Sequence, residues 1–296
     1  MTDSDRSGFV FIGAGAVGTA LALLLRDEGM TIRAVASRRE ASARRAAAIL
    51  GGAQVVNDPV EAARLGRDIF ITTPDKVIPD LARALAEARA VGVGCRVIHM
   101  SGAIGLEALQ PVRELGASVG GFHPLQASAS WERGRDLIPG STVGIEAPDE
   151  ETRTYLFGLA ARVGARPIAI PSGSRALYHA GAVSASNYLV VVFSMAVELM
   201  EEAGIRRQQA MDMLLPLARG ALDTIPAEGD AIRALTGPIV RGDADVVRAH
   251  LEAIDGVRPE MMMLYKELGL KALGLARLRG TLSREREREI EDLLSG

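Results

Sequence analysis

The sequence predicts an open, doubly wound α/β sheet over residues 1–170, followed by an all-helical domain over residues 171–296. Three observations carry this prediction. Short apolar runs alternate with helical patterns through the first part of the chain, the first run leads through a glycine-rich turn into a helix, and after Ser174 only helical patterns remain. With 296 residues, the chain is long enough for two domains, each with its own core.

Composition and charge narrow the class of protein. A net charge of −3 provides no basic surface for nucleic acid, and a hydrophobic content of 48% is typical of a globular chain. The single cysteine, Cys95, excludes an intrachain disulfide and favours a reducing compartment. Residues Met1–Gly8 show no secretory signal pattern, so we expect a cytoplasmic protein, and we expect no metal site.

The first element, Phe9–Ile12, is a four-residue apolar strand that leads into a glycine turn and then an Ala/Leu-rich helix. The turn matches G-x-G-x-x-G: Gly13 allows the tight bend, Gly15 lets a pyrophosphate approach the backbone, and Gly18 lets the helix pack closely. The alternative is a purely structural turn. We expect dinucleotide binding here, by the residues Gly13, Ala14, Gly15, Ala16, Val17 and Gly18.

The second strand, 31–36, ends at Ser37, Arg38 and Arg39. Folds that bind NAD place an acidic residue about 20 positions after the glycine motif, to accept the ribose hydroxyl. No carboxylate stands here, and a serine with two guanidinium groups can hold a 2′-phosphate instead. We therefore expect NADP rather than NAD, although the arginines could simply begin a solvated helix over 40–50.

The remaining strands of the first domain follow in order. They are expected at 54–56, 68–73, 96–100, 119–124, 142–145 and 167–170, with a helix over 149–163 between the last two. Because ligands bind outside the carboxyl ends of parallel strands, Thr73 and Pro74 are expected beside the nicotinamide ring. Ser101, after the next strand, could bond to substrate or cofactor, or simply cap a turn.

In the helical domain, the patterns break at Gly204, Pro216, Pro226, Gly237-Pro238 and Pro259. The first helix, 177–193, is apolar on nearly every face. By length it could span a membrane, but several serines and Asn187 interrupt it, so we expect it in a large core or a subunit interface, and we expect no membrane partner.

Reduction of a carbonyl by a nicotinamide requires a proton donor and groups that hold the substrate's carboxylate. His123, in a loop after a strand, and His179, on the apolar helix, are the candidate donors. Asn187 lies two helical turns after His179, where its amide must be satisfied by a neighbouring helix or by substrate. His99 and His250 are interpreted as packing and solvent-facing residues.

Several motifs together resemble one family. They are the glycine motif 13–18, Met100-Ser101-Gly102, Phe122-His123-Pro124-Leu125, Tyr178-His179-Ala180 with Ser186-Asn187-Tyr188-Leu189, and residues 235–243, Leu-Thr-Gly-Pro-Ile-Val-Arg-Gly-Asp. The chain is similar to a family that joins a Rossmann-like domain to a helical C-terminal domain of formerly unknown function. That family shares its plan with the 6-phosphogluconate dehydrogenase superfamily, which includes β-hydroxyacid dehydrogenases, pyrroline-5-carboxylate reductase and ketopantoate reductase.

The resemblance implies an NADP-dependent oxidoreductase that dimerises through its helical domain. Some members resemble an alternative ketopantoate reductase of pantothenate biosynthesis, so the most concrete expectation is reduction of 2-dehydropantoate to pantoate. Better-known relatives carry a catalytic lysine at the start of the helical domain, where this chain has Arg175. A guanidinium does not release a proton near neutral pH but can hold a carboxylate, so Arg175 and Asn187 are expected to orient substrate.

Two alternatives stay open. One is an enzyme of the same fold with another substrate or cofactor, such as an imine, a β-hydroxyacid or a deazaflavin. The other is a module that binds NADP without catalysis, because binding and catalysis share the glycine motif.

Overall fold

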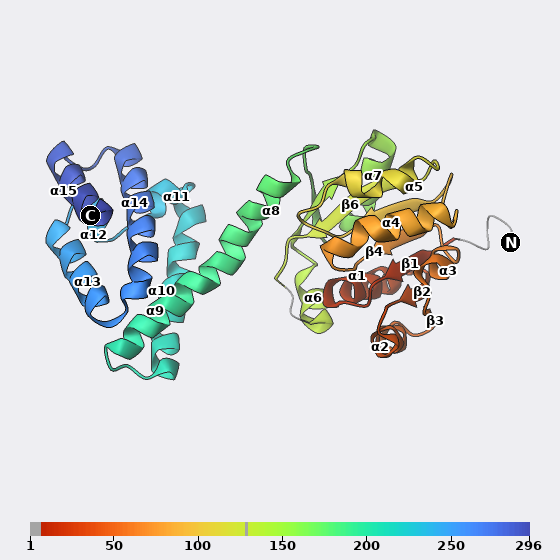
Figure 1. Ribbon diagram of the computed structural model, residues 1–296, viewed down its shortest axis with the longest axis horizontal. Coiled ribbons are helices and arrows are strands. Elements are labelled where there is room, and N and C mark those ends of the chain that lie inside the picture. Colours follow the sequence, from red (N-terminus) through yellow and green to blue (C-terminus); the bar gives the residue numbers. More distant parts are fainter. Residues whose placement is uncertain (1–6, 128–129) are drawn as a thin grey trace. The chain divides into compact units, whose positions relative to one another are not determined.

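The computed structural model describes residues 7–127 and 130–296 and divides the chain into two compact units (Figure 1). Unit 1 ends at Ser186 and carries the sheet, and unit 2 begins at Asn187 and is helical. The sequence places its domain boundary at residue 170. In the structure, helix α8 (Arg175–Val183) belongs to unit 1, because α8 packs on the sheet.

Within the described residues, unit 1 contains an eight-stranded sheet in the order β3-β2-β1-β4-β5-β6-β7-β8. The strands are β1 (Phe9–Ile12), β2 (Ile32–Ala36), β3 (Gln54–Val56), β4 (Asp68–Ile71), β5 (Arg96–His99), β6 (Ser118–Pro124), β7 (Thr142–Glu146) and β8 (Arg166–Ala169). The order reverses beside β1, between β2 and β4, and this switch point is where open α/β sheets bind ligands. The predicted doubly wound sheet is confirmed.

One pairing departs from the parallel pattern, because β6 and β7 run antiparallel. The Leu125 amide, just after β6, donates to the Thr142 carbonyl at the start of β7 over 2.8 Å. The chain therefore re-enters the sheet at the same end of the strands at which it left. Strand β8 is again parallel to β7, as the strand–helix–strand pattern over 142–170 predicts.

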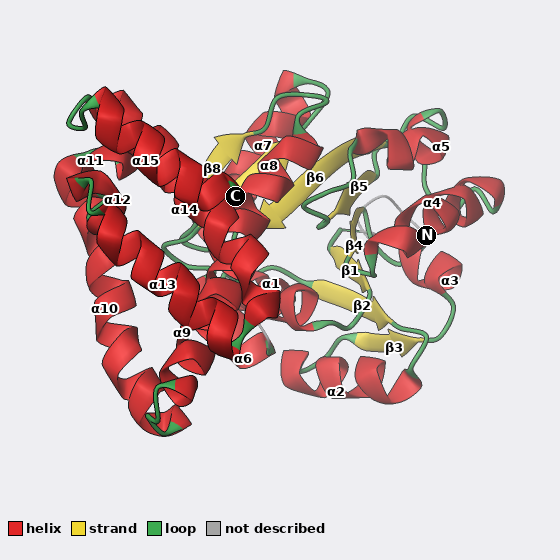
Figure 2. Cartoon of the chain, turned by 60° about the vertical axis from the view of Figure 1, so that its left-hand side comes forward, coloured by secondary structure: helices red, strands yellow, loops and turns green. Residues whose placement is uncertain are grey.

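Helices cover both faces of the sheet (Figure 2). They are α1 (Ala16–Asp27), α2 (Glu40–Leu50), α3 (Pro59–Ala63), α4 (Ile78–Glu87), α5 (Gln110–Arg113), α6 (Trp131–Leu137) and α7 (Glu150–Arg162). Successive strand residues point to opposite faces, so Phe9 and Phe11 join the core under α1, α2 and α7, whereas Val10 and Ile12 join the core under α3, α4 and α5. Full burial of a side chain such as Phe11 contributes about 2–3 kcal/mol.

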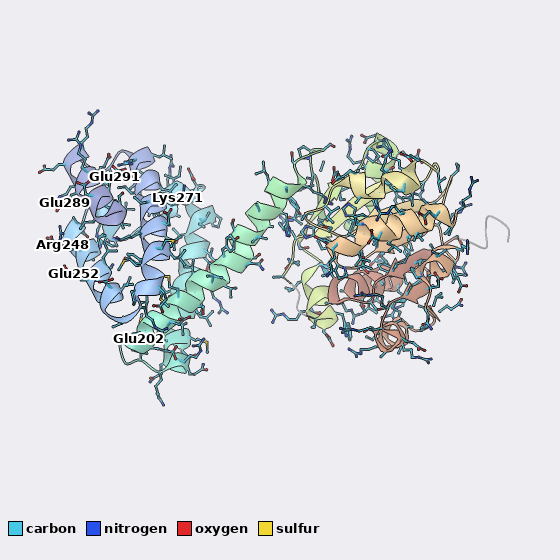
Figure 3. All side chains as sticks on the ribbon, in the orientation of Figure 1. Glu202, Arg248, Glu252, Lys271, Glu289 and Glu291 are labelled. Carbon is cyan, nitrogen blue, oxygen red and sulfur yellow. The ribbon has the colours of Figure 1, made fainter. Side chains whose placement is uncertain are left out.

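Unit 2 has its own small cores, one of which gathers Val247, Leu273, Ile290 and Leu294. Its helices are α9 (Leu189–Glu202), α10 (Arg207–Glu228), α11 (Ala231–Ala234), α12 (Pro238–Arg241), α13 (Ala244–Val257), α14 (Met262–Arg279) and α15 (Arg284–Ser295). Charged side chains such as Arg248, Glu252 and Lys271 lie on the surface of this unit (Figure 3).

The predicted helix breaks at Pro216 and Pro226 are wrong, because both prolines lie inside α10. A proline inside a helix costs about 3 kcal/mol. Helix α10 packs along α9, burying Ala210 and Leu214 with Val197, and this packing offsets that cost. The break at Gly204 is confirmed, since α9 ends just before it.

The long apolar helix runs from Arg175 to Glu202 with one π-helical turn at Ser184–Tyr188. The prediction that it lies in a core of this chain is wrong, because Leu177 is 81% and Val190 is 67% exposed. Burial in a subunit interface stays a prediction. By length and composition alone this helix could cross a membrane, which is weak evidence by itself. Its serines are satisfied locally, since Ser186 donates to the Ala182 carbonyl.

Candidate active site

The glycine turn between β1 and α1 is held by Thr72, which follows β4. The Thr72 hydroxyl donates to the Gly13 carbonyl over 2.7 Å. Gly13 has φ +120°, and a Cβ there would lie 2.5 Å from the Thr72 carbonyl carbon. A Cβ on Gly18 would lie 2.5 Å from the Thr72 hydroxyl oxygen. The first and third glycines therefore allow the turn and α1 to approach β4 closely.

Gly15 differs from these two glycines because it faces open space. The atom nearest to a Cβ built on it is the Thr72 carbonyl oxygen at 3.9 Å. Gly15 is also the N-cap of α1, whose first turn contains no acidic side chain. The free amides and positive dipole end of α1 thus lie beside bare backbone, which is the arrangement that holds a pyrophosphate.

A pocket of about 450 Å³ extends from this turn to the end of β2. Gly13 and Gly15 line one side, and Ser37, Arg38 and Arg39 line the other. Both arginine side chains are exposed, and no acidic side chain is among the described residues that line the pocket. Positive charge without a carboxylate suits a ribose that carries a 2′-phosphate.

A second pocket, of about 250 Å³, adjoins the first and shares Gly15, Thr72 and Thr73 with it. Ser101 and His123 line its far end. A continuous groove in unit 1 therefore runs from Arg38, across the glycine turn, to an imidazole. This arrangement suits an extended dinucleotide with its reactive ring at the His123 end.

His123 is oriented by Tyr178 of α8. The Tyr178 hydroxyl lies 3.0 Å from His123 Nδ1, and the His123 and His179 rings meet edge to face with centroids 5.9 Å apart. Gly102 leaves room for both imidazoles, since a Cβ there would lie 2.5 Å from His179 Nδ1 and 2.8 Å from His123 Nε2. The two predicted proton donors are thus side by side.

Three glycines explain how α8 reaches the sheet. Arg175, Tyr178 and His179 lie on one helical face, at positions i, i+3 and i+4. Each side chain lies against a glycine, in space that a larger residue there would fill. Arg175 lies against Gly121, Tyr178 against Gly144, and His179 against Gly102. Larger residues at these glycines would hold this face away from the strand ends.

Arg175 lies in a buried row of charged and titratable groups. His99, Gly121 and Glu146 are paired across β5, β6 and β7, and Arg175 Nε lies 3.2 Å from Glu146 Oε2 over the gap that Gly121 leaves. Burial is the main cause that lowers the pKa of Arg175 and raises that of Glu146, while their mutual attraction opposes both shifts. The paired charges are therefore held in a region of low polarity.

The same surroundings keep two imidazoles neutral. Burial, followed by the positive charge of Arg175, lowers the pKa of His99 to about 3 and that of His123 to about 4. Burial also raises the pKa of Tyr178, against the effect of Arg175, so its hydroxyl keeps its proton. Near neutral pH, His123 is a neutral hydrogen-bonding ring rather than an imidazolium.

Three of the other predicted site residues, Ser101, Thr73 and Pro74, line the two pockets, whereas Arg175 and Asn187 do not. The buried Ser101 hydroxyl accepts from the amides of Ala103 and Ile104, so it caps the turn as well as lining the pocket. Thr73 lines both pockets and Pro74 the larger one. Arg175 is not among the residues that line the His123 pocket, and Asn187 belongs to unit 2, where its side chain is exposed.

Tyr178 and Glu146 are not predicted as site residues from the sequence, and His99 is interpreted there as a packing residue. Tyr178 stands in the quoted Tyr-His-Ala motif, three positions after Arg175, and that spacing could have indicated a shared helical face. Glu146 has no such signal, because its burial depends on pairing between strands. Among the described residues, no group of three or more His, Cys, Asp or Glu side chains gathers as a metal site.

Comparisons with known proteins agree with the fold. Residues 3–124 match the model of a Rossmann-like domain, and residues 141–272, which begin just before β7, match a domain of unknown function, DUF2520. Among curated proteins, no sequence matches at a significant level.

Solved structures share the fold along most of the chain. A candidate NADP oxidoreductase from Bacteroides fragilis, BF3122, is 26% identical with a TM-score of 0.74, covering 90% of this chain and 98% of that protein. Protein TM1727 from Thermotoga maritima is 23% identical with a TM-score of 0.69, covering 92% and 99%. A reductive aminase from Aspergillus terreus, in complex with NADPH and ethyl-5-oxohexanoate, is 18% identical with a TM-score of 0.58, covering 98% and 93%.

Proposed function

We propose that this chain, which has the fold of NADP-dependent oxidoreductases, uses NADPH to reduce a small 2-oxo acid. The fold consists of a Rossmann-like domain followed by a DUF2520 region. One observation carries the proposal. Two adjoining pockets of unit 1, which share Gly15, Thr72 and Thr73, connect Arg38 and Arg39 with the imidazole of His123.

The cofactor assignment rests on charge and space. Ser37, Arg38 and Arg39 would hold the 2′-phosphate, the α1 amides and Gly15 would hold the pyrophosphate, and Thr73 and Pro74 would flank the nicotinamide. The Bacteroides protein is described as a candidate NADP oxidoreductase, which supports this choice. When bound, NADPH supplies the hydride.

His123 would supply the proton. With its pKa lowered to about 4, the ring is neutral near pH 7. In the proposed tautomer the Tyr178 hydroxyl, 3.0 Å away, donates to Nδ1, and Nε2 carries the hydrogen. An Nε2–H aimed at the substrate oxygen polarises the carbonyl and then gives its proton to the developing alkoxide. As Nε2 loses its proton, Tyr178 can restore one at Nδ1, and solvent reprotonates the tyrosine. His179, beside it, is the second candidate donor.

The resemblance in sequence supports 2-dehydropantoate as the first substrate to test. A specific observation also supports imine reduction as a second candidate, because the reductive aminase from Aspergillus terreus shares the fold. We also propose a cytoplasmic homodimer. The exposed apolar side chains of the long helix, among them Leu177 and Val190, support an interface with a second copy.

A substrate panel tests the proposal. NADPH absorbance is followed with 2-dehydropantoate, other 2-oxo acids, cyclic imines and, in the oxidative direction, β-hydroxyacids. We expect turnover of a 2-oxo acid that falls about 10²- to 10⁴-fold in His123→Ala and is unchanged in His250→Ala, a histidine of unit 2. Tight NADPH binding with no turnover of any compound would favour the non-catalytic module.

A further inference from the structure

A separate cavity of about 620 Å³ lies in unit 1 at the N-terminus of α8. It shares no residue with the His123 pocket, and the loop 101–103 separates them, with Ser101 lining one and Ala103 the other. Its inner wall includes Arg175 and Glu146. The reaction proposed above makes no use of this cavity.

Arg175 carries donors that the protein itself does not satisfy. The residue is 2% exposed, and none of its three guanidinium nitrogens has a hydrogen-bond partner among the described residues. Its contact with Glu146 is an ion pair at 3.2 Å without hydrogen-bond geometry. A buried donor left unsatisfied costs about 1–3 kcal/mol, more when it is charged, so an acceptor that reaches this guanidinium binds favourably.

The start of α8 provides a second attraction for an anion. The first turn of this nine-residue helix contains no acidic side chain, and the Ser174 side chain makes no capping hydrogen bond. Residues 172–176 border the cavity, apart from Ser174, so the positive end of the helix dipole faces it. Arg113, exposed at the rim, adds a further positive charge.

Glu146 needs a hydrogen-bond donor, whereas Arg175 needs an acceptor. It is 4% exposed, and its Oε2 atom accepts no hydrogen bond among the described residues. Glu107 also lines the cavity, so the four charged side chains there sum to zero. A bare anion would meet two carboxylates, whereas a ligand with both an acceptor and a donor satisfies both buried partners.

We propose that this cavity binds a small carboxylate whose α-carbon carries a hydroxyl or amino group. The ligand carboxylate accepts from Arg175 and from the first amides of α8, and the α-substituent donates to Glu146. This site is distinct from the cofactor groove and from the pocket at His123.

The test uses the full chain without NADPH and three probes: glycolate, glycine and acetate. Binding is followed by calorimetry and by amide NMR shifts. We expect glycolate or glycine to bind and to shift amides around the start of α8. Acetate should bind about tenfold more weakly, because it lacks the donor that Glu146 accepts.

A matched pair of variants locates the binding. Ala176→Phe fills the cavity with a side chain but leaves Arg175 and Glu146 in place, so probe affinity should fall at least about tenfold. Ala180→Phe, one turn later and outside the cavity, should leave affinity unchanged. The melting of each variant, followed through Trp131, shows whether unit 1 is folded.

The proposal is overturned if no probe binds the folded wild type, or if Ala176→Phe binds as tightly as wild type. If acetate binds as well as glycolate and glycine, the assigned donor to Glu146 is wrong and the proposal fails in that form. NADPH turnover without probe binding would refute this site alone. Probe binding without turnover of any substrate would support this site and count against the proposed reductase.

Discussion

Acid should destabilise unit 1 because folding keeps His99 and His123 neutral. In the folded protein their pKa values are lowered to about 3 and about 4. In an unfolded chain a histidine titrates near about 6.5. Between these values the unfolded state binds more protons than the folded state, so the free energy of unfolding is highest above about pH 6.5 and falls as the pH decreases.

The magnitude follows from those pKa values. Each pKa unit corresponds to about 1.4 kcal/mol, so at about pH 5 each histidine has lost about 2 kcal/mol of its contribution and the pair about 4 kcal/mol. Glu146 acts in the opposite direction, since its raised pKa favours protonation in the folded state as the pH falls toward the usual glutamate value, and it offsets part of the loss. A domain has about 5–15 kcal/mol of stability in total, so the loss should be easy to measure.

The assay is urea unfolding followed by the fluorescence of Trp131, the chain's single tryptophan, which packs against the core of unit 1. His99→Gln should reduce the dependence on pH by about half, because one of the two groups no longer titrates. His250→Gln, in unit 2, serves as the control. Equal stabilities at about pH 8 and about pH 5, or an unchanged slope in His99→Gln, would refute the reasoning.

Three further predictions concern the groove. Gly18→Ala places a methyl group 2.5 Å from the Thr72 hydroxyl, so unit 1 should lose about 1–3 kcal/mol in urea unfolding and NADPH titration should show weaker binding. Tyr178→Phe removes the hydroxyl 3.0 Å from His123 Nδ1, and steady-state kinetics should show kcat about tenfold lower, with the Kd for NADPH unchanged. Gly102→Ala places a methyl group 2.8 Å from the His123 ring, so turnover should fall in the same assay while NADPH still binds. Full turnover in both Tyr178→Phe and Gly102→Ala would remove His123 from the mechanism.

The sequence predicted the sheet well because its signals are local. Apolar runs such as Phe9–Ile12 and the glycines after them report strand, turn and helix within a few residues, and the structure shows these elements. The antiparallel step from β6 to β7 has no local signal, because it depends on where the connection re-enters the sheet.

The candidate site could likewise be predicted from the sequence only where its signals are local. His123 is conspicuous in the sequence, although the prediction that it lies in a loop is wrong, because β6 continues through it and pairs it with Gly144 of β7. The buried row of His99, Arg175 and Glu146 exists only because Gly121 leaves room on the neighbouring strand. Long-range pairing decides which polar residues become buried, and a single sequence does not report it. The prolines of α10 show the converse, since packing against α9 overrides a strong local signal.

The most direct test of the account is the affinity of the folded chain for NADPH and NADH, measured by fluorescence titration in the wild type and in Arg38→Ala. The account predicts that NADPH binds about 10- to 100-fold more tightly than NADH, as one charge-assisted contact to the 2′-phosphate would give. Arg38→Ala should lose much of that preference, whereas Arg83→Ala, an exposed arginine of α4 outside the pocket, should keep it. Equal affinities, or a preference for NADH, would contradict the assignment of the groove.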